Sequence, residues 1–316
     1  ARPAAALPLP ETLDGPAEPD LAPERAAIEE LRRAHRALVM TSYSRIKRRH
    51  GGYVSPLDAD SFKGETVPAD PLLPAVEPDA LPGGVAMGIL LHEVIEVLPL
   101  DTLASAPAVE VWAADPRVST VLEEKLQQHG VDPGLRPAIE RLVHRSLTSP
   151  VQLGDVIVPA LAGVTSSARE LEFTFPHPEV VHPAIAAALT DPLAVERGYV
   201  QGVIDLVFEH QGRTYFADWK TDILPDYAAP AIATHVERNY RLQAQLYALA
   251  MIKLLAIRDR AAYEARFGGL VYCFLRGMRP SPDGASPGVY FERPDFDELV
   301  RFDRTRPESY WDDFLL

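Results

Sequence analysis

Apolar residues in the first half of the chain recur at the spacing of a helix. A stripe with intervals of three and four predicts an amphipathic helix that begins at Gly88. The members of this stripe are Leu91, Val94, Ile95 and Leu98. Proline, glycine and charge signals predict further helices within 115–148 and a short helix over 23–36. The first half of the chain is therefore expected to be helical.

The second half changes to the two-residue period of β-strands. Segments dense in β-branched and aromatic residues predict strands over 170–175, 199–209, 213–219 and 270–275. Between the last two of these strands, one long helix is predicted over about 229–257. Residues 51–84 are rich in Pro, Gly and Asp and are predicted to form a loop. Strands interleaved with a helix indicate an α/β second half.

The composition is that of a folded protein with a proline-rich beginning. Of the 316 residues, 47% are hydrophobic and 24% are charged, which is enough for a buried core. Prolines interleaved with alanine and acids predict an extended linker over 1–24, followed by a helix-and-loop lead-in over 25–84. Because the chain lacks an initiator Met and a secretory signal, we expect it to be a segment of something longer.

Cysteine content and hydropathy bear on the compartment. The single cysteine, Cys273, excludes an internal disulfide and an iron–sulfur cluster held by cysteines, and it fits a reducing cytoplasm. No run reaches the roughly 18 apolar residues that a membrane span needs. The richest stretch, 85–98, is interrupted by His92, Glu93 and Glu96. We therefore expect a soluble, cytoplasmic protein with no membrane partner.

The acidic charge constrains how the protein could meet nucleic acid. A net charge of −14 disfavours a protein that finds nucleic acid by long-range attraction. The one dense basic run, within 45–49, is interpreted as a solvated face or tether rather than a phosphate contact. No GxxxxGK[ST] pattern is present, so we expect no ATP site in this segment. Acids can gather to hold divalent cations, however, and a partner can deliver a nucleic acid.

The segment GVIDLVFEHQGRTYFADWKT, residues 202–221, predicts a β-hairpin with two acids on facing strands. If Gln211 and Gly212 form a two-residue loop, the register places Asp205 opposite Asp218. Their Cβ atoms would then lie about 5 Å apart. Two bare carboxylates at that distance repel each other unless a cation lies between them, and carboxylate oxygens suit Mg²⁺ or Mn²⁺. The hairpin therefore predicts a metal site.

Strand alternation completes this candidate site. Lys220 lies two residues after Asp218, so its ammonium is expected on the same face, beside the carboxylates. The opposite face is predicted to be apolar and to pack on helices; it comprises Ile204, Leu206, Phe208, Tyr215, Ala217 and Trp219. A register slip of one residue would send one carboxylate to the other face. An exposed hairpin with an acid on each strand therefore remains the alternative interpretation.

The hairpin resembles a known nuclease motif. GVIDLVF together with DWKT is similar to the motif of the PD-(D/E)XK nuclease superfamily, and specifically to the C-terminal nuclease domain of RecB-type helicase-nucleases. Four further stretches agree in the same order along the chain, namely LPGGVAMGILLHEVIE, ARELEF, NYRLQAQLY and FGGLVYCFLRG. Together with TSYS at 41–44, the resemblance extends from about residue 40 to beyond residue 290.

The resemblance implies roles for further residues. It places a metal-binding histidine at His92 and matches Glu170 to a glutamate before the first core strand. It also implies that Gln243 and Tyr247 reach the active site or the DNA backbone, and Tyr240 shares their helix face. Taken with the hairpin, the expected metal ligands are His92, Asp205, Asp218 and a main-chain carbonyl at Trp219. The expected catalytic residues are Asp205, Asp218, Lys220 and Glu170.

Histidine 92 also invites two other interpretations. A lone histidine on such a helix is often a surface residue or a satisfied core residue. The sequence His92-Glu93-x-x-Glu96 comes close to the H-E-x-x-H zinc signature, but Glu96 stands where the second histidine must be. A metalloprotease is therefore excluded, and Glu96 is interpreted as solvated.

The resemblance implies a restriction-endonuclease-like α/β fold, in which a central mixed β-sheet is flanked by helices and the N-terminal half is helical. The nuclease domain is expected over 85–316, with a helical part at 85–165 and an α/β core at 166–316. The implied cofactor is Mg²⁺, with Mn²⁺ as an alternative and Ca²⁺ binding without supporting cleavage.

The implied function is metal-dependent hydrolysis of DNA, as the nuclease module of a RecB-like helicase-nuclease that processes DNA ends in double-strand-break repair. Its expected partners are DNA ends and single strands from a helicase motor, helicase domains in cis and partner subunits in trans. The alternatives are a free-standing exonuclease or resolvase of the same superfamily and a non-catalytic DNA-guiding scaffold. Clustered carboxylates disfavour the scaffold, since a scaffold gains nothing from them.

Overall fold

The computed structural model describes residues 39–42, 81–106, 108–164, 166–177, 198–282 and 284–303, all within one compact unit that spans 39–316. The helix predicted over 23–36, the basic run at 45–49 and most of the loop predicted over 51–84 lie outside these residues. The strands are β1 (Val39–Ser42), β2 (Val151–Leu153), β3 (Val156–Val158), β4 (Ser167–His177), β5 (Gly198–His210), β6 (Arg213–Lys220), β7 (Phe267–Phe274) and β8 (Val289–Glu292). The helices are α3 (Val85–Val97), α4 (Leu100–Ser105), α5 (Val109–Ala113), α6 (Pro116–Gln128), α7 (Arg136–Thr148), α9 (Ala229–Asn239), α10 (Arg241–Leu254), α11 (Arg260–Arg266) and α12 (Phe296–Asp303).

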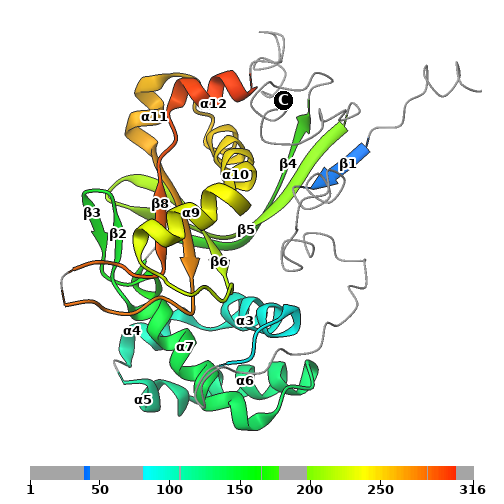
Figure 1. The fold of residues 1–316 in the computed structure, drawn as a ribbon, viewed down its shortest axis with the longest axis vertical. Coiled ribbons are helices and arrows are strands. Elements are labelled where there is room, and N and C mark those ends of the chain that lie inside the picture. The colour runs from blue at the N-terminus through cyan, green and yellow to red at the C-terminus, as the bar shows by residue number, and fades with distance from the viewer. Residues whose placement is uncertain are drawn as a thin grey trace, which may run out of the picture. The chain divides into compact units, whose positions relative to one another are not determined.

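A mixed six-stranded sheet organises the fold (Figure 1). Its order is β1-β5-β6-β7-β8, and β4 pairs with β5 as well. The β1–β5 and β6–β7 pairs are parallel, whereas β4–β5, β5–β6 and β7–β8 are antiparallel. Strands β2 and β3 form a separate small hairpin. The predicted α/β fold, with a central mixed sheet flanked by helices, is confirmed.

Two hydrophobic cores hold the helices on the sheet. Figure 1 shows one group of helices, α3 to α7, below the sheet and another, α9 to α12, above it. The first core joins the lower group to the sheet and includes Leu91, Val94, Trp112, Leu122, Val143, Leu206, Phe208, Tyr215, Ala217 and Trp219. The second core joins the upper group and includes Val200, Ile204, Phe216, Val236, Leu246, Phe267, Tyr272, Phe274 and Leu299. The hairpin of β5 and β6 contributes side chains to both cores.

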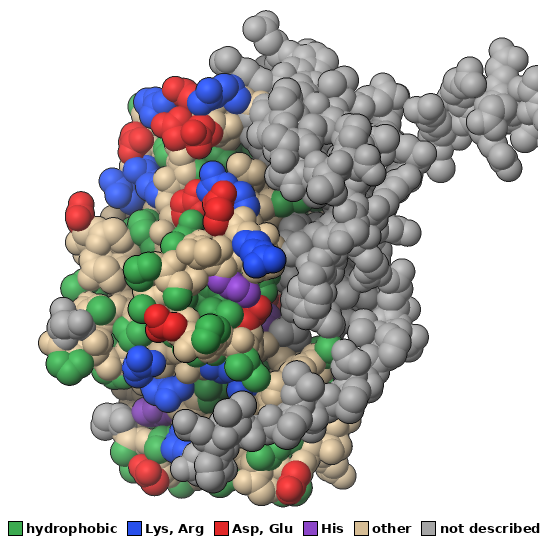
Figure 2. Space-filling view, in the orientation of Figure 1, with side chains coloured by type: hydrophobic (Ala, Val, Ile, Leu, Met, Phe, Trp, Pro, Cys, Tyr) green, Lys and Arg blue, Asp and Glu red, His purple; other side chains and the backbone are tan. Residues whose placement is uncertain are grey.

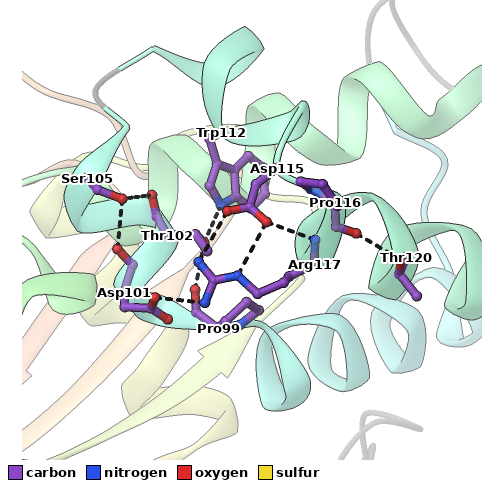
Figure 3. Close-up of polar contacts among 9 residues, drawn as sticks. All are labelled: Pro99, Asp101, Thr102, Ser105, Trp112, Asp115, Pro116, Arg117 and Thr120. Atoms are coloured by element: carbon purple, nitrogen blue, oxygen red, sulfur yellow. Dashed lines mark hydrogen bonds and ion pairs between the residues drawn. The ribbon is translucent and has the colours of Figure 1, made fainter.

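Polar contacts tie the short helices of the lower group together (Figure 3). The indole Nε1 of Trp112 donates to Thr102 Oγ1 at 3.0 Å. Asp115 caps α6 by accepting from the N–H of Arg117 at 2.8 Å, and the Arg117 guanidinium reaches Asp101 at 2.9 Å. Helices α4 and α5 were not predicted, because each is too short to show an apolar period.

Helix α3, which carries His92, is fixed at both ends by arginines from the sheet region. Its predicted apolar stripe is buried, although the helix begins at Val85 rather than Gly88. Before the helix, Arg276 donates to the carbonyls of Leu81 at 2.7 Å and Pro82 at 2.6 Å. At its end, Arg169 donates to the carbonyls of Ile95 at 3.0 Å and Leu98 at 2.6 Å. The position of His92 relative to the sheet is therefore set by its whole helix.

The single helix predicted over 229–257 is wrong. The structure has two helices, α9 and α10, which meet at Tyr240. Tyr240 leaves the helical conformation, with φ −123° and ψ 0°. Strands β1, β2, β3 and β8 and helices α11 and α12 were also not predicted. Among the described residues, no helix combines the length and the apolar character that crossing a bilayer requires.

Candidate active site

The predicted hairpin register is present. Gln211 and Gly212 form the two-residue loop with φ of 49° and 76°, and positive φ at both loop positions is what a type I′ turn needs. The ladder extends from the His210–Arg213 pair to the Leu206–Ala217 pair. It ends one position before Asp205 and Asp218 would pair, so these two residues lie where the two strands part.

The Asp205 side chain lies at a gap along one edge of β5. On that edge, β1 pairs with Gly198–Gln201 and β6 pairs with Leu206–His210. Beyond the β6 ladder, the main-chain N–H of Trp219 donates to Asp205 Oδ2 at 2.6 Å. The carboxylate thus takes the place of a strand–strand hydrogen bond, and it is held next to Asp218 in sequence.

The alternation of β5 changes at Asp205, and one predicted contact is wrong for that reason. Leu206 and Phe208 lie in the first core as predicted, but Ile204 lies in the second core. On the paired strand β4, the residue at the same position, Glu170, has a φ of 51°. This left-handed conformation is rare for a residue with a Cβ, and the β4–β5 register skips the Glu170–Asp205 position, so the irregularity lies at the same level of both strands. Ile204 therefore faces away from Leu206.

Asp218 and Lys220 are joined by a glutamine from α10. The Lys220 ammonium lies 2.6 Å from Asp218 Oδ2 and donates to Gln243 Oε1 at 2.9 Å. The Gln243 amide donates in turn to Asp218 Oδ1 at 3.1 Å. All three side chains are buried. The structure thus brings Gln243 to the two hairpin residues, and it makes their face part of the second core, because Phe216 on the same face is buried there.

Tyr240 and Asp222 form a second layer behind Lys220. The Tyr240 hydroxyl donates to the Asp222 carboxylate, at 2.9 Å and 3.0 Å to its two oxygens, and His235 Nε2 lies 3.2 Å from Asp222 Oδ1. Burial opposes ionisation of Asp222, but the hydrogen bond from His235 and the Lys220 charge hold its pKa below the usual range. Asp222 and His235 were not predicted. Asp222 continues the alternation of Asp218 and Lys220, which is the signal that could have found it.

His92 meets the site from α3. Its Nδ1 lies 3.6 Å from Asp205 Oδ1, and the two side chains are 24% and 11% exposed. Burial lowers the tendency of the imidazole to be charged, but the Asp205 carboxylate, with help from Asp218, raises the pKa of His92 to about 9. Its Nε2 is buried and has no hydrogen-bond partner within the part of the chain that the structure describes.

Glu170 lies close enough to these acids to be affected by them. Burial and the charges of Asp205 and Glu96 raise the pKa of Glu170 to about 7. Glu96 itself is exposed, as predicted. Its neighbour Glu93 bonds to Lys125 at 2.7 Å and to His129 at 3.0 Å on α6, which is a contact between helices. The Glu93 side chain therefore serves packing of α3 on α6.

The donor atoms at this site suit a hard divalent cation, although they are not drawn together into a cluster. Among the described residues, no three His, Cys, Asp or Glu side chains lie close enough to hold a metal ion. His92 and Asp205 are adjacent, while Asp218 is held by Lys220 and Gln243. Nδ1 of His92 faces the Asp205 carboxylate, and the buried Nε2 has no hydrogen-bond partner among the described residues. Imidazole and carboxylates are ligands for the divalent cations that assist hydrolysis.

Tyr247 is buried against other aromatic side chains. It is 4% exposed, and its ring lies edge-on to Phe173 at 5.1 Å and tilted against Phe216 at 6.5 Å. Gly202 lies beneath these rings, and a Cβ there would come within 2.5 Å of Phe173 and 3.3 Å of Tyr247. The structure therefore places Tyr247 in the second core, where it supports β5 near Asp205.

Comparisons with known proteins identify the class. The family model described as the PD-(D/E)XK nuclease superfamily matches residues 71–308. The chain belongs to the PD-(D/E)XK nuclease superfamily. Its sheet flanked by helices and its paired acids with a following lysine agree with that membership.

The curated relatives that match the chain include RecB subunits. The chain is 31% identical over 282 residues to the RecBCD enzyme subunit RecB of Escherichia coli (strain K12), which covers 81% of this chain and 22% of the relative. It is 26% identical over 244 residues to the same subunit of Haemophilus influenzae. That match covers 71% of this chain and 18% of the relative. It is 29% identical over 263 residues to the subunit of Mycobacterium tuberculosis (strain ATCC 25618 / H37Rv). That match covers 68% of this chain and 23% of the relative. The predicted resemblance to RecB-type nuclease domains is confirmed, and the chain spans about a fifth of the length of these relatives.

Proposed function

We propose that this chain is a divalent-metal-dependent DNA nuclease that hydrolyses phosphodiester bonds. We further propose that it serves as the nuclease module of a RecB-like helicase-nuclease that processes DNA ends in double-strand-break repair. The observation that carries the proposal is the contact of Lys220 with Asp218 beside Asp205 and His92. The superfamily match and the RecB relatives support it.

The side chains of the site would have two different roles, metal binding and stabilisation of the phosphate charge. Asp205, Asp218, His92 and a main-chain carbonyl at Trp219 would hold the cation. Lys220 would place its ammonium against the negative charge that develops on the scissile phosphate, or orient the attacking water. Bound Mg²⁺ would polarise the phosphate and make a water more acidic.

Glu170 and Gln243 would complete the site. With a pKa of about 7, Glu170 can accept or release a proton near neutral pH beside Asp205. Gln243 keeps Lys220 and Asp218 at fixed positions through one hydrogen bond to each. Holding the reacting groups in place before the substrate arrives contributes to the rate, since less order has to be created during the reaction.

The surface favours delivery of DNA by a partner. The net charge is −14, and on the described surface seen in Figure 2 acidic and basic side chains are interspersed instead of forming one broad basic face. Such a surface attracts DNA weakly. Since the RecB relatives are about five times longer than the matched region, we propose that helicase domains in cis and partner subunits in trans supply the strands. The chain alone should then bind DNA weakly in EDTA, and tight binding there would argue against delivery.

A cleavage assay tests the proposal directly. The chain is incubated with end-labelled single-stranded and duplex DNA in Mg²⁺, in Ca²⁺ and in EDTA. We expect products in Mg²⁺ alone, and none from Asp205→Ala or Lys220→Ala, which should keep the wild-type circular dichroism spectrum. Cleavage at the wild-type rate by either variant would show that this site assignment is wrong.

A matched control separates lost chemistry from lost stability. Lys253 on α10 is also a buried lysine paired with a carboxylate, since it donates to Asp303 at 2.8 Å and the two side chains are 8% and 4% exposed. Lys253→Met removes a buried ion pair of the same kind, beside Phe175 of the second core. It should lower stability while leaving cleavage by the folded fraction unchanged, in contrast to Lys220→Met.

A further inference from the structure

The Lys220 ammonium is enclosed by aromatic rings as well as by its polar partners. Its side chain is 5% exposed. The Nζ atom lies 4.1 Å from the centroid of the Tyr240 ring and 5.1 Å from that of the Tyr272 ring. An ammonium that has lost its water is stabilised by the negative face of an aromatic ring. Asp218 and Gln243 therefore account for only part of its surroundings.

The Tyr240 ring is fixed independently of Lys220. Tyr240 occupies the junction of α9 and α10, where its main-chain N–H donates to the Val236 carbonyl at 2.7 Å.

Results

Sequence analysis

Apolar residues in the first half of the chain recur at the spacing of a helix. A stripe with intervals of three and four predicts an amphipathic helix that begins at Gly88. The members of this stripe are Leu91, Val94, Ile95 and Leu98. Proline, glycine and charge signals predict further helices within 115–148 and a short helix over 23–36. The first half of the chain is therefore expected to be helical.

The second half changes to the two-residue period of β-strands. Segments dense in β-branched and aromatic residues predict strands over 170–175, 199–209, 213–219 and 270–275. Between the last two of these strands, one long helix is predicted over about 229–257. Residues 51–84 are rich in Pro, Gly and Asp and are predicted to form a loop. Strands interleaved with a helix indicate an α/β second half.

The composition is that of a folded protein with a proline-rich beginning. Of the 316 residues, 47% are hydrophobic and 24% are charged, which is enough for a buried core. Prolines interleaved with alanine and acids predict an extended linker over 1–24, followed by a helix-and-loop lead-in over 25–84. Because the chain lacks an initiator Met and a secretory signal, we expect it to be a segment of something longer.

Cysteine content and hydropathy bear on the compartment. The single cysteine, Cys273, excludes an internal disulfide and an iron–sulfur cluster held by cysteines, and it fits a reducing cytoplasm. No run reaches the roughly 18 apolar residues that a membrane span needs. The richest stretch, 85–98, is interrupted by His92, Glu93 and Glu96. We therefore expect a soluble, cytoplasmic protein with no membrane partner.

The acidic charge constrains how the protein could meet nucleic acid. A net charge of −14 disfavours a protein that finds nucleic acid by long-range attraction. The one dense basic run, within 45–49, is interpreted as a solvated face or tether rather than a phosphate contact. No GxxxxGK[ST] pattern is present, so we expect no ATP site in this segment. Acids can gather to hold divalent cations, however, and a partner can deliver a nucleic acid.

The segment GVIDLVFEHQGRTYFADWKT, residues 202–221, predicts a β-hairpin with two acids on facing strands. If Gln211 and Gly212 form a two-residue loop, the register places Asp205 opposite Asp218. Their Cβ atoms would then lie about 5 Å apart. Two bare carboxylates at that distance repel each other unless a cation lies between them, and carboxylate oxygens suit Mg²⁺ or Mn²⁺. The hairpin therefore predicts a metal site.

Strand alternation completes this candidate site. Lys220 lies two residues after Asp218, so its ammonium is expected on the same face, beside the carboxylates. The opposite face is predicted to be apolar and to pack on helices; it comprises Ile204, Leu206, Phe208, Tyr215, Ala217 and Trp219. A register slip of one residue would send one carboxylate to the other face. An exposed hairpin with an acid on each strand therefore remains the alternative interpretation.

The hairpin resembles a known nuclease motif. GVIDLVF together with DWKT is similar to the motif of the PD-(D/E)XK nuclease superfamily, and specifically to the C-terminal nuclease domain of RecB-type helicase-nucleases. Four further stretches agree in the same order along the chain, namely LPGGVAMGILLHEVIE, ARELEF, NYRLQAQLY and FGGLVYCFLRG. Together with TSYS at 41–44, the resemblance extends from about residue 40 to beyond residue 290.

The resemblance implies roles for further residues. It places a metal-binding histidine at His92 and matches Glu170 to a glutamate before the first core strand. It also implies that Gln243 and Tyr247 reach the active site or the DNA backbone, and Tyr240 shares their helix face. Taken with the hairpin, the expected metal ligands are His92, Asp205, Asp218 and a main-chain carbonyl at Trp219. The expected catalytic residues are Asp205, Asp218, Lys220 and Glu170.

His92 also invites two other interpretations. A lone histidine on such a helix is often a surface residue or a satisfied core residue. The sequence His92-Glu93-x-x-Glu96 comes close to the H-E-x-x-H zinc signature, but Glu96 stands where the second histidine must be. A metalloprotease is therefore excluded, and Glu96 is interpreted as solvated.

The resemblance implies a restriction-endonuclease-like α/β fold, in which a central mixed β-sheet is flanked by helices and the N-terminal half is helical. The nuclease domain is expected over 85–316, with a helical part at 85–165 and an α/β core at 166–316. The implied cofactor is Mg²⁺, with Mn²⁺ as an alternative and Ca²⁺ binding without supporting cleavage.

The implied function is metal-dependent hydrolysis of DNA, as the nuclease module of a RecB-like helicase-nuclease that processes DNA ends in double-strand-break repair. Its expected partners are DNA ends and single strands from a helicase motor, helicase domains in cis and partner subunits in trans. The alternatives are a free-standing exonuclease or resolvase of the same superfamily and a non-catalytic DNA-guiding scaffold. Clustered carboxylates disfavour the scaffold, since a scaffold gains nothing from them.

Overall fold

The computed structural model describes residues 39–42, 81–106, 108–164, 166–177, 198–282 and 284–303, all within one compact unit that spans 39–316. The helix predicted over 23–36, the basic run at 45–49 and most of the loop predicted over 51–84 lie outside these residues. The strands are β1 (Val39–Ser42), β2 (Val151–Leu153), β3 (Val156–Val158), β4 (Ser167–His177), β5 (Gly198–His210), β6 (Arg213–Lys220), β7 (Phe267–Phe274) and β8 (Val289–Glu292). The helices are α3 (Val85–Val97), α4 (Leu100–Ser105), α5 (Val109–Ala113), α6 (Pro116–Gln128), α7 (Arg136–Thr148), α9 (Ala229–Asn239), α10 (Arg241–Leu254), α11 (Arg260–Arg266) and α12 (Phe296–Asp303).

A mixed six-stranded sheet organises the fold (Figure 1). Its order is β1-β5-β6-β7-β8, and β4 pairs with β5 as well. The β1–β5 and β6–β7 pairs are parallel, whereas β4–β5, β5–β6 and β7–β8 are antiparallel. Strands β2 and β3 form a separate small hairpin. The predicted α/β fold, with a central mixed sheet flanked by helices, is confirmed.

Two hydrophobic cores hold the helices on the sheet. Figure 1 shows one group of helices, α3 to α7, below the sheet and another, α9 to α12, beside its upper part. The first core joins the lower group to the sheet and includes Leu91, Val94, Trp112, Leu122, Val143, Leu206, Phe208, Tyr215, Ala217 and Trp219. The second core joins the upper group and includes Val200, Ile204, Phe216, Val236, Leu246, Phe267, Tyr272, Phe274 and Leu299. The hairpin of β5 and β6 contributes side chains to both cores.

Polar contacts tie the short helices of the lower group together (Figure 3). The indole Nε1 of Trp112 donates to Thr102 Oγ1 at 3.0 Å. Asp115 caps α6 by accepting from the N–H of Arg117 at 2.8 Å, and the Arg117 guanidinium reaches Asp101 at 2.9 Å. Helices α4 and α5 were not predicted, because each is too short to show an apolar period.

Helix α3, which carries His92, is fixed at both ends by arginines from the sheet region. Its predicted apolar stripe is buried, although the helix begins at residue 85 rather than 88. Before the helix, Arg276 donates to the carbonyls of residues 81 and 82 at 2.7 Å and 2.6 Å. At its end, Arg169 donates to the carbonyls of Ile95 at 3.0 Å and Leu98 at 2.6 Å. The position of His92 relative to the sheet is therefore set by its whole helix.

The single helix predicted over 229–257 is wrong. The structure has two helices, α9 and α10, which meet at Tyr240. Tyr240 leaves the helical conformation, with φ −123° and ψ 0°. Strands β1, β2, β3 and β8 and helices α11 and α12 were also not predicted. Among the described residues, no helix combines the length and the apolar character that crossing a bilayer requires.

Candidate active site

The predicted hairpin register is present. Gln211 and Gly212 form the two-residue loop with φ of 49° and 76°, and positive φ at both loop positions is what a type I′ turn needs. The ladder extends from the His210–Arg213 pair to the Leu206–Ala217 pair. It ends one position before Asp205 and Asp218 would pair, so these two residues lie where the ladder stops.

The Asp205 side chain lies at a gap along β5. Strand β1 pairs with Gly198–Gln201, and β6 pairs with Leu206–His210. Beyond the β6 ladder, the main-chain N–H of Trp219 donates to Asp205 Oδ2 at 2.6 Å. The Asp205 carboxylate thus accepts from a main-chain N–H of β6 just beyond the ladder. This bond holds Asp205 next to Trp219, the residue that follows Asp218.

The alternation of β5 changes at Asp205, and one predicted contact is wrong for that reason. Leu206 and Phe208 lie in the first core as predicted, but Ile204 lies in the second core. On the paired strand β4, the residue at the same position, Glu170, has a φ of 51°. This left-handed conformation is rare for a residue with a Cβ, and the β4–β5 register skips the Glu170–Asp205 position, so the irregularity lies at the same level of both strands. Ile204 therefore joins a different core from Leu206.

Asp218 and Lys220 are joined by a glutamine from α10. The Lys220 ammonium lies 2.6 Å from Asp218 Oδ2 and donates to Gln243 Oε1 at 2.9 Å. The Gln243 amide donates in turn to Asp218 Oδ1 at 3.1 Å. All three side chains are buried. The structure thus brings Gln243 to the two hairpin residues, and it makes their face part of the second core, because Phe216 is buried there.

Tyr240 and Asp222 lie behind Lys220. The Tyr240 hydroxyl donates to the Asp222 carboxylate, at 2.9 Å and 3.0 Å from its two oxygens, and His235 Nε2 lies 3.2 Å from Asp222 Oδ1. Burial opposes ionisation of Asp222, but the hydrogen bond from His235 and the Lys220 charge hold its pKa below the usual range. Asp222 and His235 were not predicted. Asp222 continues the alternation of Asp218 and Lys220, which is the signal that could have found it.

His92 meets the site from α3. Its Nδ1 lies 3.6 Å from Asp205 Oδ1, and the two side chains are 24% and 11% exposed. Burial disfavours the charged imidazole, but the Asp205 carboxylate, with help from Asp218, raises the pKa of His92 to about 9. The Nε2 atom of His92 is buried and has no hydrogen-bond partner within the part of the chain that the structure describes.

Glu170 lies close enough to these acids to be affected by them. Burial and the charges of Asp205 and Glu96 raise the pKa of Glu170 to about 7. Glu96 itself is exposed, as predicted. Its neighbour Glu93 accepts from Lys125 of α6 at 2.7 Å and lies 3.0 Å from Nε2 of His129, the residue that follows α6. The Glu93 side chain therefore joins α3 to α6.

The donor atoms at this site suit a hard divalent cation, although they are not drawn together into a cluster. Among the described residues, no three His, Cys, Asp or Glu side chains lie close enough to hold a metal ion. His92 and Asp205 are adjacent, while Asp218 is bound to Lys220 and Gln243. Nδ1 of His92 faces the Asp205 carboxylate, and the buried Nε2 has no hydrogen-bond partner among the described residues. Imidazole and carboxylates are ligands for the divalent cations that assist hydrolysis, so the donor set fits.

Tyr247 is buried against other aromatic side chains. It is 4% exposed, and its ring lies edge-on to Phe173 at 5.1 Å and tilted against Phe216 at 6.5 Å. Gly202 lies against these rings, since a Cβ there would come within 2.5 Å of Phe173 and 3.3 Å of Tyr247. The structure therefore places Tyr247 in the second core, where it packs on β5 three residues before Asp205.

Comparisons with known proteins identify the class. The family model described as the PD-(D/E)XK nuclease superfamily matches residues 71–308. The chain belongs to the PD-(D/E)XK nuclease superfamily. Its sheet flanked by helices and its acids with a following lysine agree with that membership.

The curated relatives that match the chain include RecB subunits. The chain is 31% identical over 282 residues to the RecBCD enzyme subunit RecB of Escherichia coli (strain K12), which covers 81% of this chain and 22% of the relative. It is 26% identical over 244 residues to the same subunit of Haemophilus influenzae. That match covers 71% of this chain and 18% of the relative. It is 29% identical over 263 residues to the subunit of Mycobacterium tuberculosis (strain ATCC 25618 / H37Rv). That match covers 68% of this chain and 23% of the relative. The predicted resemblance to RecB-type nuclease domains is confirmed, and the chain spans about a fifth of the length of these relatives.

Proposed function

We propose that this chain is a divalent-metal-dependent DNA nuclease that hydrolyses phosphodiester bonds. We further propose that it serves as the nuclease module of a RecB-like helicase-nuclease that processes DNA ends in double-strand-break repair. The observation that carries the proposal is the contact of Lys220 with Asp218, together with that of Asp205 with His92. The superfamily match and the RecB relatives support it.

The side chains of the site would have two different roles, metal binding and stabilisation of the phosphate charge. The cation would be held by His92, Asp205, Asp218 and a main-chain carbonyl at Trp219. Lys220 would place its ammonium against the negative charge that develops on the scissile phosphate, or orient the attacking water. Bound Mg²⁺ would polarise the phosphate and make a water more acidic.

Glu170 and Gln243 would complete the site. With a pKa of about 7, Glu170 can accept or release a proton near neutral pH beside Asp205. Gln243 keeps Lys220 and Asp218 at fixed positions through one hydrogen bond to each. Groups that are held in place before the substrate arrives contribute to the rate, since less order has to be created during the reaction.

The surface favours delivery of DNA by a partner. The net charge is −14, and on the described surface seen in Figure 2 acidic and basic side chains are interspersed instead of forming one broad basic face. Such a surface attracts DNA weakly. Since the chain spans only about a fifth of its RecB relatives, we propose that helicase domains in cis and partner subunits in trans supply the strands. The chain alone should then bind DNA weakly in EDTA, and tight binding there would argue against delivery.

A cleavage assay tests the proposal directly. The chain is incubated with end-labelled single-stranded and duplex DNA in Mg²⁺, in Ca²⁺ and in EDTA. We expect products in Mg²⁺ alone, and none from Asp205→Ala or Lys220→Ala, which should keep the wild-type circular dichroism spectrum. Cleavage at the wild-type rate by either variant would show that this site assignment is wrong.

A matched control separates lost chemistry from lost stability. Lys253 on α10 is also a buried lysine paired with a carboxylate, since it donates to Asp303 at 2.8 Å and the two side chains are 8% and 4% exposed. Lys253→Met removes a buried ion pair of the same kind, beside Phe175 of the second core. It should lower stability while leaving cleavage by the folded fraction unchanged, in contrast to Lys220→Met.

A further inference from the structure

The Lys220 ammonium is enclosed by aromatic rings as well as by its polar partners. Its side chain is 5% exposed. The Nζ atom lies 4.1 Å from the centroid of the Tyr240 ring and 5.1 Å from that of the Tyr272 ring. An ammonium that has lost its water is stabilised by the negative face of an aromatic ring. Asp218 and Gln243 therefore account for only part of its surroundings.

The Tyr240 ring is fixed independently of Lys220. Tyr240 occupies the junction of α9 and α10, where its main-chain N–H donates to the Val236 carbonyl at 2.7 Å. Its hydroxyl is bound to Asp222, and the ring of His235 lies edge-on to it with 5.7 Å between centroids. The break between the two helices thus has a consequence for the site, because it lets a tyrosine turn its face to the lysine.

The Tyr272 ring is fixed by the sheet. In the parallel pairing of β6 with β7, Tyr272 lies opposite Asp218. Its hydroxyl is 3.3 Å from Gln243 Oε1, the same atom that accepts from Lys220, and its ring is tilted against Tyr240 at 5.6 Å. The two rings therefore contact each other as well as the ammonium, and they form two adjoining walls.

We propose that Tyr240 and Tyr272 are positioning residues whose rings form an aromatic cage that fixes the ammonium of Lys220, with Asp222 holding Tyr240 from behind. The consequence for catalysis rests on the proposed nuclease function, whereas the cage itself does not. Lysine is a compact charge on a flexible four-carbon stem, so without such walls its ammonium would sample several positions. An ammonium that is already held in one position loses less entropy when the transition state forms, which favours the reaction.

The cage is tested first on the protein without metal, by nuclear magnetic resonance. Protons next to the face of an aromatic ring shift upfield, so the Hε signals of Lys220, assigned by their loss in Lys220→Met, should lie upfield of those of exposed lysines. Tyr240→Phe keeps the ring and should keep most of the shift, and Tyr240→Leu should lose much of it. Lys220 Hε signals at the position of exposed lysines in the wild type would overturn the proposal without any variant of the cage.

A control in the same core separates the cage from general packing. Tyr263 is a buried tyrosine of α11 that packs on Phe267 and Phe296, so Tyr263→Leu removes an equally buried ring away from Lys220. It should lower stability but leave the Lys220 Hε shift unchanged. An equal loss of the shift in Tyr263→Leu and Tyr240→Leu would show that the tyrosine acts through packing alone, and would overturn the proposal.

Kinetics then test the consequence. Tyr240→Leu should lower kcat about ten-fold or more, in line with loss of a desolvated cation–π contact, and should leave KM for DNA near the wild-type value. Tyr240→Phe should restore most of kcat. A Tyr240→Phe variant as slow as Tyr240→Leu would assign the effect to the hydroxyl and overturn the role of the ring. Failure of the proposed function has a different signature, because Lys220→Met would then cleave DNA while the resonance shifts still report on the cage.

Discussion

Asp205 and Asp218 belong to one hairpin, but their surroundings differ. The Asp218 side chain is 6% exposed, and its two oxygens contact Lys220 and Gln243. The Asp205 side chain is 11% exposed; one oxygen accepts from the Trp219 main chain, and the other faces the imidazole of His92 at 3.6 Å. One carboxylate is bound by a lysine and an amide, and the other lies beside a histidine whose Nε2 has no hydrogen-bond partner among the described residues.

The difference shows how the two helix groups divide the site. On the α10 side, buried side chains fix the lysine, with aromatic rings around it. On the α3 side, His92 is 24% exposed, and its helix is held by Arg276 before its start and Arg169 at its end. We therefore expect the α10 side to hold the Lys220 ammonium in place. On the α3 side, we expect a bound cation to exchange its ligands with solvent and substrate.

The largest contrast is expected between two isosteric substitutions. Asp218→Asn leaves the buried Lys220 ammonium without its carboxylate and should lower the free energy of unfolding by about 3–5 kcal/mol. Asp205→Asn retains an acceptor for the Trp219 N–H and should cost about 1 kcal/mol. Both variants should fail to cleave DNA. Urea unfolding in EDTA measures the stabilities, and equal costs for the two variants would remove the distinction between the two carboxylates.

Gln243→Leu should have the next largest effect. It removes one hydrogen-bond partner from each of Lys220 and Asp218 in a buried place, which should cost about 1–3 kcal/mol. Cleavage should fall at least ten-fold, roughly the effect of about 1.4 kcal/mol on a barrier. Gln127→Leu, at an exposed position of α6, is the control and should change neither quantity appreciably. Unaltered cleavage by Gln243→Leu would mean that the amide does not position the lysine.

Arg169→Met probes the other side of the site. It removes the donor to the carbonyls of Ile95 and Leu98 and should cost about 1–2 kcal/mol, because the end of α3 loses its partner. Hydrogen exchange should rise in the last turn of α3 and not in α10. Uniform acceleration of exchange in both helices would show that the two sides are not independent.

The smallest expected effect depends on pH. Because Asp222 has a lowered pKa in the folded protein, its ionised form contributes stability above the unfolded pKa of about 3.9, and this contribution is lost as the pH falls through the folded value. Asp222→Asn should therefore be about 1 kcal/mol less stable than the wild type near pH 7, and the gap should narrow in acid. Urea unfolding from neutral to acidic pH measures the gap. A difference in the free energy of unfolding that stays constant with pH would contradict ionic stabilisation by Asp222.

The hairpin could be predicted from the sequence because its determinants are local. A two-residue loop with positive φ at both positions sets the register, and the register sets which residues approach Asp205 and Asp218. The position of Ile204 could not be predicted, since it follows an irregularity that β5 shares with another strand, where Glu170 has a left-handed conformation. Periodicity gives no sign of such a conformation in a residue other than glycine or asparagine.

The surroundings of Lys220 could be predicted only in part. The motif Gln243-x-x-x-Tyr247 indicated α10, but it treated the two residues alike, whereas Gln243 contacts Lys220 and Tyr247 packs on Phe173. Tyr272 reaches the lysine through the parallel pairing of β6 and β7, which joins segments about fifty residues apart. Such non-local contacts leave no period in the sequence, so the rings around Lys220 become visible only in the fold.

We expect His92 and Asp205 to form the open side of a divalent-metal site. Electron spin echo spectroscopy of bound Mn²⁺ tests it most directly, because the method detects a nitrogen ligand on the metal. The wild-type chain should show nitrogen modulation from one imidazole, and His92→Gln should lose the modulation while still binding Mn²⁺ through its carboxylates. Nitrogen modulation that is missing from the wild type, or that persists unchanged in His92→Gln, would contradict this assignment.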